Sequence, residues 1–186
     1  MKLKVCGMRE NQNIKDVLSI DPDFMGFIFF EKSPRHLEED WQPEVIHEFP
    51  KDTMKVGVFV NEALEKVYKK VQDYQLDMVQ LHGNESVEYC QKLQSLRVSV
   101  MKVFSVDEAF DFESVVPYQK ACKQFLFDTK AAGGYGGHGK AFDWNLLEKY
   151  KLDTPFLLAG GIDLDNFQDL TSIQNPAFMG IDVNSK

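Results

Sequence analysis

Hydrophobic and polar positions follow two alternating patterns along the whole chain. Short runs rich in β-branched and aromatic residues are separated by segments in which apolar residues recur at helical spacing. Runs of the first kind, bounded by polar or turn-forming residues, predict β-strands. Eight such strands are expected, at residues 2–6, 25–30, 55–60, 78–81, 98–104, 124–128, 156–159 and 178–183.

The segments between these strands predict amphipathic helices. In two of them apolar residues recur three or four positions apart, so that they share one helical face. These stripes are Leu64, Val67, Tyr68 and Val71, and Leu164, Phe167 and Leu170. Weaker helical patterns occur at residues 14–18, 45–49, 87–93, 112–118 and 142–150. Asn61 and Asn84 stand where the N-caps of two helices are expected.

Strict alternation of strands and helices predicts right-handed βαβ crossovers and a parallel sheet. Eight such units close most economically into a (β/α)8 TIM barrel, an α/β fold, expected as a single domain over residues 1–186. An open doubly wound sheet is the alternative. The sequence ends at Lys186, shortly after the eighth predicted strand, so the C-terminal helix that should cover this strand is expected to be missing.

Composition and charge narrow the classes of function. Hydrophobic residues make up 44% and charged residues 27% of the chain, as in ordinary globular proteins. No apolar run approaches the length of about 18 residues that a membrane span requires, and the N-terminus does not resemble a secretory signal. A net charge of −8 disfavours binding to nucleic acid and to acidic membranes. We therefore expect a cytoplasmic protein, either a monomer or a homodimer.

The cysteines do not predict a metal site or a disulfide framework. Cys6, Cys90 and Cys122 lack metal-ligand spacing, and their number is odd in a chain without an export signal. We expect reduced thiols and no bound metal. For Cys90 and Cys122 the expected role is that of small buried hydrophobic residues.

Polar residues gather where the predicted strands end. In a parallel barrel the active site lies at the C-terminal ends of the strands. Lys4 and Cys6 lie two positions apart, so both side chains are expected inside the barrel, where the Lys4 cation would favour the Cys6 thiolate. The other polar or glycine residues at strand ends are Gln80, His82, Asp128, Gly160, Gly161, Asp182 and Asn184.

Six fragments of the sequence, in the same order along the chain, resemble one known family. They are KVCGMRE, GFIFFEKSPR, VQLHG, GGHGKAFDW, LAGGI and GIDVNS. Together they resemble the phosphoribosylanthranilate isomerases over nearly the whole chain. The resemblance implies an Amadori rearrangement in tryptophan biosynthesis that requires no cofactor and no metal. Its substrate would be phosphoribosylanthranilate, and its product 1-(2-carboxyphenylamino)-1-deoxyribulose 5-phosphate.

The resemblance also implies roles for individual residues. Asp128 would be the acid that protonates the furanose oxygen and opens the ring to a Schiff base, and Cys6 the base that removes the proton on the carbon next to this Schiff base. At neutral pH an ordinary Asp is ionised and an ordinary Cys is protonated, so the surroundings must reverse both states. Burial would keep the proton on Asp128, and a positive field would remove it from Cys6. Arg35 is implied as the partner of the anthranilate carboxylate.

Further residues are candidates for substrate binding. Backbone N–H groups of Gly160 and Gly161, and the segment at Asn184 and Ser185, suit the substrate phosphate. His82 is expected to act in a structural or secondary way, and Asp182 to support the site as a buried partner of loop N–H groups. The full set of candidates for contact with the rest of this phosphosugar substrate is His82, Gly137, Gly139 and Asp182.

Other interpretations stay open at this point. Without the motif, Cys6 would be a core residue and Asp128 a cap of the following segment. Lys102 or Lys130 could form a Schiff base, as in an aldolase or the barrel enzyme that makes indole-glycerol phosphate. A barrel that binds a phosphosugar without turnover is the non-enzymatic alternative. The glycine-rich loop departs from the family pattern at His138, so its contacts are not predicted.

Overall fold

Eight parallel strands form a closed ring in the computed structural model, which describes residues 1–37, 49–129 and 141–184. Each strand pairs with its neighbours in sequence, and β8 pairs with β1, so that Asp182 lies opposite Lys4. This ring confirms the predicted barrel and excludes the open sheet. The strands are β1 (Lys2–Val5), β2 (Phe24–Ile28), β3 (Met54–Phe59), β4 (Met78–Leu81), β5 (Ser99–Val106), β6 (Gln124–Thr129), β7 (Phe156–Ala159) and β8 (Phe178–Val183).

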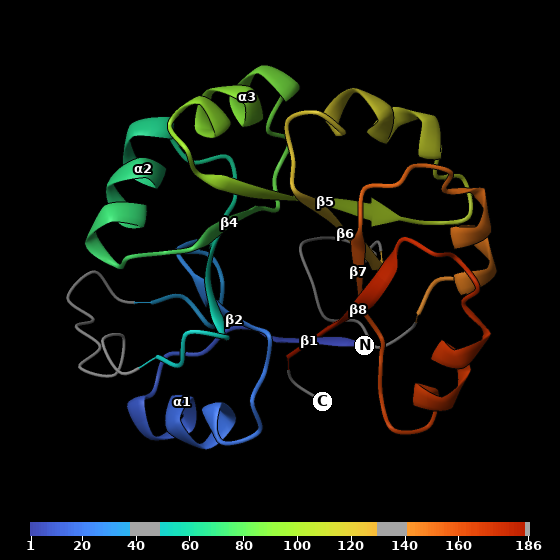
Figure 1. The fold of residues 1–186 in the computed structure, drawn as a ribbon, viewed down its shortest axis with the longest axis horizontal. Coiled ribbons are helices and arrows are strands. Elements are labelled where there is room, and N and C mark those ends of the chain that lie inside the picture. The colour runs from blue at the N-terminus through green and yellow to red at the C-terminus, as the bar shows by residue number, and fades with distance from the viewer. Residues whose placement is uncertain (38–48, 130–140, 185–186) are drawn as a thin grey trace.

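Helices surround the ring of strands (Figure 1). Residues 45–48 of one predicted helix lie outside the described residues, and Phe49 is not helical. Within the described ranges, no helix is long and apolar enough to cross a membrane. The helices there are α1 (Asn11–Leu18), α2 (Leu64–Asp73), α3 (Val87–Ser95) and the 3-10 helices η2 (Phe112–Tyr118), η3 (Trp144–Lys149) and η4 (Phe167–Ser172).

The first of the two predicted apolar stripes is confirmed and the second is only partly so. Val67 and Val71 of α2 are buried in the core. Leu164, in contrast, is 95% exposed, and only Leu170 of its stripe is buried. The cause is a turn before η4, in which the Asp163 carboxylate accepts hydrogen bonds from two of the backbone N–H groups that follow it. Helical spacing does not continue through such a turn.

The prediction of N-caps at Asn61 and Asn84 is wrong. α3 is capped by Ser86, whose hydroxyl accepts a hydrogen bond from the N–H of Tyr89, and α2 begins after Ala63 without a side-chain cap. Instead, the N–H of Asn84 donates to Oδ1 of Asn61 at 2.7 Å. The two asparagines therefore tie the loop after β3 to the loop after β4.

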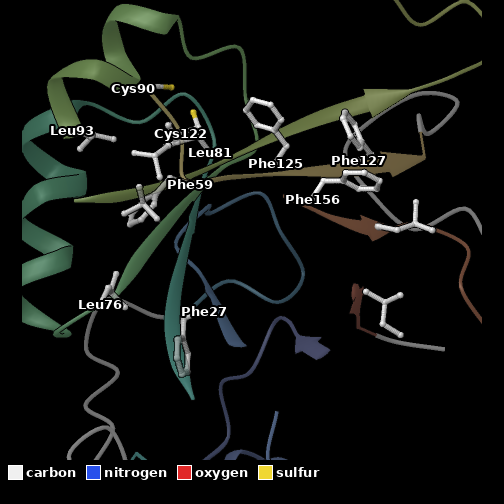
Figure 2. Packing of buried hydrophobic residues seen from close by; sticks show 14 of the residues in the cluster. Phe27, Phe59, Leu76, Leu81, Cys90, Leu93, Cys122, Phe125, Phe127 and Phe156 are labelled. Atoms are coloured by element: carbon white, nitrogen blue, oxygen red, sulfur yellow. The ribbon is translucent and has the colours of Figure 1, made fainter. Parts of the chain in front are cut away.

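Alternate strand positions fill the inside of the barrel and cover its outside. On the outside, Phe125, Phe127 and Phe156 project from neighbouring strands into the main apolar cluster, as Figure 2 shows. The ring of Phe127 lies 5.3 Å from that of Tyr150 and 5.0 Å from that of Phe156, close to perpendicular to both. The inner cluster consists of Phe24, Val56, Met78, Met101, Val103, Leu126, Leu157 and Ala159.

Substitution of Phe127 tests the importance of this outer layer. Phe127 is fully buried, so Phe127→Ala should lower the free energy of unfolding by about 3–5 kcal/mol through lost burial and a new cavity. Phe167→Ala is the matched control, because Phe167 is 44% exposed and should lose less than about 1 kcal/mol. Urea denaturation followed by circular dichroism measures both. Equal losses in the two variants would contradict this account of the core.

Candidate active site

The predicted site residues that the structure describes lie at the C-terminal ends of strands or, in the case of Arg35, in the loop after β2. Cys6 directly follows β1 and His82 follows β4, whereas Asp128 and Asp182 occupy the penultimate positions of β6 and β8. Because the strands are parallel and the ring is closed, these ends form one mouth. Gly160 and Gly161 follow β7, Asn184 follows β8, and Gly137, Gly139, Ser185, Lys130 and His138 lie outside the described residues.

Lys4 and Asp182 form a buried ion pair beneath Cys6. Nζ of Lys4 lies 2.8 Å from Oδ2 of Asp182, and the two side chains are 0% and 8% exposed. Lys4 also lies near the Cys6 side chain, whose thiolate its ammonium favours. Gly26 on β2 leaves room for this contact, since a Cβ there would lie 2.6 Å from Sγ of Cys6 and 3.1 Å from Nζ of Lys4. The expected proximity of Lys4 to Cys6 is therefore confirmed.

The electrostatics of this group differ in one respect from the sequence-based expectation. Burial raises the pKa of the Cys6 thiol, and the Lys4 ammonium opposes this shift without reversing it. Burial alone would lower the pKa of Lys4, but the negative charge of the paired Asp182 carboxylate raises it, so Lys4 stays charged. At neutral pH the ligand-free site therefore holds a thiol next to a cation.

Asp128 meets the requirement for an acid. Its side chain is 14% exposed, and burial, followed by repulsion from Asp182, raises its pKa to about 6. Nε2 of His82 lies 3.5 Å from Oδ2 of Asp128, which would be an ion pair if His82 were protonated. Burial and the nearby charges of Lys102 and Lys4 lower the pKa of His82 to about 4, so at neutral pH the imidazole is uncharged. The contact is not a salt bridge under those conditions.

The glycines after β7 allow the chain to turn directly beside Asp128. Gly160 has a φ of +81° and Gly161 a φ of +71°, a backbone conformation that side-chain-bearing residues rarely adopt. A Cβ on Gly160 would lie 2.5 Å from Oδ1 of Asp128 and 2.7 Å from the backbone N of Thr129. The hydroxyl of Thr129 donates to the Gly160 carbonyl at 3.1 Å. Gly160 is therefore needed to place the β7 loop against the acid.

Arg35 and Asn184 approach the same point from opposite sides of β1. A Cβ on Gly7, the residue after Cys6, would lie 2.7 Å from Cδ of Arg35 and 3.0 Å from Nδ2 of Asn184. Both side chains carry hydrogen-bond donors. The predicted carboxylate-binding residue and one of the predicted phosphate-binding residues thus lie next to Cys6.

The sequence-based role of Asp182 is corrected by the structure. Asp182 was expected to accept hydrogen bonds from loop N–H groups, but its Oδ2 pairs with Lys4. Its Oδ1 is buried without a hydrogen-bond partner among the described residues, as is Oε1 of Gln80 on β4. The inward direction of Gln80 follows from sequence parity, whereas the pairing of Asp182 with Lys4 requires closure of the barrel.

Lys102 does not lie at the mouth. Its Nζ donates to the carbonyl oxygens of Leu81, Gly83 and Val103 at 3.1, 2.8 and 3.1 Å, and lies 3.2 Å from Oε2 of Glu85. All its N–H donors are engaged, which disfavours this lysine as a Schiff-base nucleophile. In the part of the chain that the structure describes, no group of three or more His, Cys, Asp or Glu residues is arranged to hold a metal ion.

Known proteins of one family resemble this chain over its whole length. A family model described as N-(5'-phosphoribosyl)anthranilate (PRA) isomerase matches residues 3–186. The N-(5'-phosphoribosyl)anthranilate isomerase of Parabacteroides distasonis is 45% identical over 186 residues, covering 100% of this chain and 84% of the relative.

Two solved structures have the same fold as this chain. The crystal structure of phosphoribosyl anthranilate isomerase from Thermotoga maritima has a TM-score of 0.87 and 33% identity, covering 100% of this chain and 88% of its own. A phosphoribosyl anthranilate isomerase crystallised with reduced 1-(o-carboxyphenylamino)-1-deoxyribulose 5-phosphate has a TM-score of 0.82 and 30% identity. The match covers 100% of this chain and 87% of that one. Fold, motifs and relatives agree, and the chain belongs to the N-(5'-phosphoribosyl)anthranilate isomerase family.

Proposed function

We propose that this chain isomerises N-(5'-phosphoribosyl)anthranilate to 1-(2-carboxyphenylamino)-1-deoxyribulose 5-phosphate, with Asp128 as the acid and Cys6 as the base. The activity, an aldose–ketose isomerisation of tryptophan biosynthesis, follows from membership of the family. The observation that carries the assignment of residues is the position of a protonatable carboxyl and a thiol at one barrel mouth. Asp128 has a raised pKa, and Cys6 lies near a buried cation.

The reaction needs two proton transfers, at the ring oxygen and at C2 of the sugar, both of which are bonded to C1. Asp128 donates its proton to the furanose oxygen, the bond from this oxygen to C1 breaks, and the anilinic nitrogen forms a double bond to C1. The Cys6 thiolate then removes the proton from C2, and the electron pair of the C–H bond moves to give an enolamine, which tautomerises to the ketone. General acid–base catalysis of this kind contributes about 100- to 10,000-fold.

The reaction requires a protonated Asp128 and a Cys6 thiolate. These protonation states occur together in one minor form of the site. A pKa of about 6 gives Asp128 about 100 times the protonated fraction of an ordinary Asp at neutral pH. In the ligand-free site Cys6 is a thiol. The active form therefore arises when a proton moves from Cys6 to the Asp128 carboxylate. This transfer leaves the total charge of the mouth unchanged. The ammonium of Lys4 stabilises the thiolate that the transfer produces.

Hydrogen-bond donors suited to the two charged ends of the substrate lie at the mouth. Arg35, beside Gly7, supplies a planar guanidinium for the anthranilate carboxylate. The glycines at 160 and 161 and the amide of Asn184 offer donors to the phosphate. Oδ1 of Asp182 is a buried acceptor without a partner in the described structure, which suits a sugar hydroxyl as donor. A small phosphosugar is therefore the proposed ligand.

The alternatives from sequence analysis have less support. Lys102 has its ammonium engaged on the outer side of the barrel, which weakens the Schiff-base alternative, and Lys130 lies outside the described residues. A barrel that only binds a phosphosugar would not require an acid of raised pKa. The cytoplasmic location and the choice between monomer and homodimer stay predictions.

Removal of either proton-transfer group tests the assignment. Cys6→Ala and Asp128→Asn should each lower kcat by about 100- to 10,000-fold, because one proton transfer loses its carrier. Both variants should still bind the reduced product by calorimetry, since the donors for carboxylate and phosphate remain. Cys90→Ala is the matched control, because Cys90 is a buried thiol on α3 away from the mouth. Product formation at the wild-type rate in Cys6→Ala or Asp128→Asn would refute the roles proposed here.

The raised pKa of Asp128 also predicts a change in stability. A carboxyl whose folded-state pKa is about 6 instead of 3.8 stabilises the fold below pH 4, and this contribution disappears as the pH rises through 6. Asp128→Asn should therefore raise the free energy of unfolding at pH 8 by about 3 kcal/mol, and by little below pH 4. Asp165→Asn, at an exposed site, is the control for loss of one charge. If both variants showed the same pH dependence of stability, burial would not be the cause.

A further inference from the structure

Lys102 lies on the outer side of the barrel, behind the active-site mouth. Its neighbours on β5, Met101 and Val103, belong to the inner apolar cluster, so Lys102 points the other way. Its Nζ lies 5.6 Å from the ring centre of Phe104, which also faces outward. The side chain is only 4% exposed. A lysine this deeply buried requires compensating partners for its charge.

The partners of Lys102 are backbone carbonyl groups, two of them on either side of His82 where β4 ends and its loop begins. The ammonium donates to the carbonyl oxygens of Leu81 and Gly83, at 3.1 and 2.8 Å, and to that of Val103 at 3.1 Å. Leu81 and Gly83 flank His82 in sequence. Because an ammonium has three donors, these bonds use its full capacity. The residues on both sides of His82 are thus held by one cation.

Glu85 completes this arrangement from the same loop. Its side chain is 2% exposed, and its Oε2 lies 3.2 Å from Nζ of Lys102. Oε1 of Glu85 accepts a hydrogen bond from the N–H of Asn61 at 2.8 Å, and Oε2 accepts one from the N–H of Gly83 at 3.0 Å. The pair of Lys102 and Glu85 therefore connects the chain after β3, the chain after β4 and the middle of β5.

His82 lies between these fixed points and faces the acid. Its backbone N–H donates to the carbonyl oxygen of Phe59 at 2.8 Å, and its Nε2 lies 3.5 Å from Oδ2 of Asp128. We propose that Lys102 is a positioning residue of the active site, which fixes the backbone on both sides of His82 and so holds this imidazole against Asp128. The inference rests on the proposed role of Asp128 as the acid.

The charged groups around His82 determine the protonation state of its imidazole. His82 is faced by Lys102 from β5, by Lys4 from β1, by Glu85 from its own loop and by Asp128 from β6. Burial and then the two lysine charges lower the pKa of His82, and Glu85 opposes them. A protonated His82 would favour the ionised form of Asp128 and so compete for the proton of the acid. An uncharged His82 does not compete for that proton.

Titration of His82 by NMR tests the proposal without relying on turnover. In the wild-type protein the imidazole signal, assigned by its loss in His82→Gln, should titrate with a midpoint near 4. Lys102→Met should move this midpoint up toward 6.5, because a nearby cation is lost. Glu85→Gln should move it down, because an anion is lost. Lys92→Met, at an exposed lysine on α3, is the control and should leave it unchanged.

Kinetics provide the second readout. Lys102→Met should lower kcat by about 10- to 100-fold, the effect of displacing a catalytic group by about 1 Å. KM should change by much less, because the donors for the substrate's charged ends lie elsewhere. Lys92→Met should retain the wild-type kcat.

Three results would overturn the proposal. They are a wild-type His82 that titrates near 6.5, a folded Lys102→Met protein with an unchanged His82 midpoint, and a shifted midpoint with wild-type kcat. The first needs no variant of Lys102, so it decides the question even if Lys102→Met does not fold. If the wild-type chain showed no isomerase activity, the proposed function would fail, while the His82 titration would still report on positioning.

Discussion

Closure of the barrel through the pairing of β1 with β8 is the constraint on which the active site depends. It brings Lys4 and Asp182, 178 positions apart in the sequence, within 2.8 Å inside the barrel. Burial of such an ion pair seldom adds stability compared with apolar side chains of the same size. Its consequence here is electrostatic, because it fixes a cation beside Cys6 and an anion that repels charge on Asp128.

Desolvation is the common cause of the unusual protonation states at the mouth, and it acts unequally on the two catalytic groups. Burial disfavours the charged form of each group, which suits an acid that must keep its proton and opposes a base that must lose one. The mouth therefore contains a cation next to Cys6 and an uncharged imidazole next to Asp128. Lys4 and Lys102 supply positive charge from inside and outside the barrel, so both layers contribute to the chemistry.

Much of the fold and the location of the site could be predicted from sequence, because strand parity and strand polarity are local properties of the chain. Contacts that depend on closure or on two loops meeting could not. Asp182 was expected to bind loop N–H groups but pairs with Lys4, and Asn61 and Asn84 resemble helix caps but join two loops. These asparagines occupy plausible cap positions in sequence, and only the tertiary structure shows their actual partners. Assignments that stay predictions because they fall outside the described residues are Gly137, Gly139 and Ser185.

The central claim is that burial keeps a proton on Asp128 well above the usual pH range of a carboxyl group. The most direct measurement is a 13C NMR titration of the Asp128 carboxyl carbon in the ligand-free protein, with the signal assigned by its loss in Asp128→Asn. The account predicts a midpoint at a pH of about 6. A midpoint at the ordinary value of 3.8 would contradict it, because Asp128 would then be no better an acid at neutral pH than an exposed aspartate.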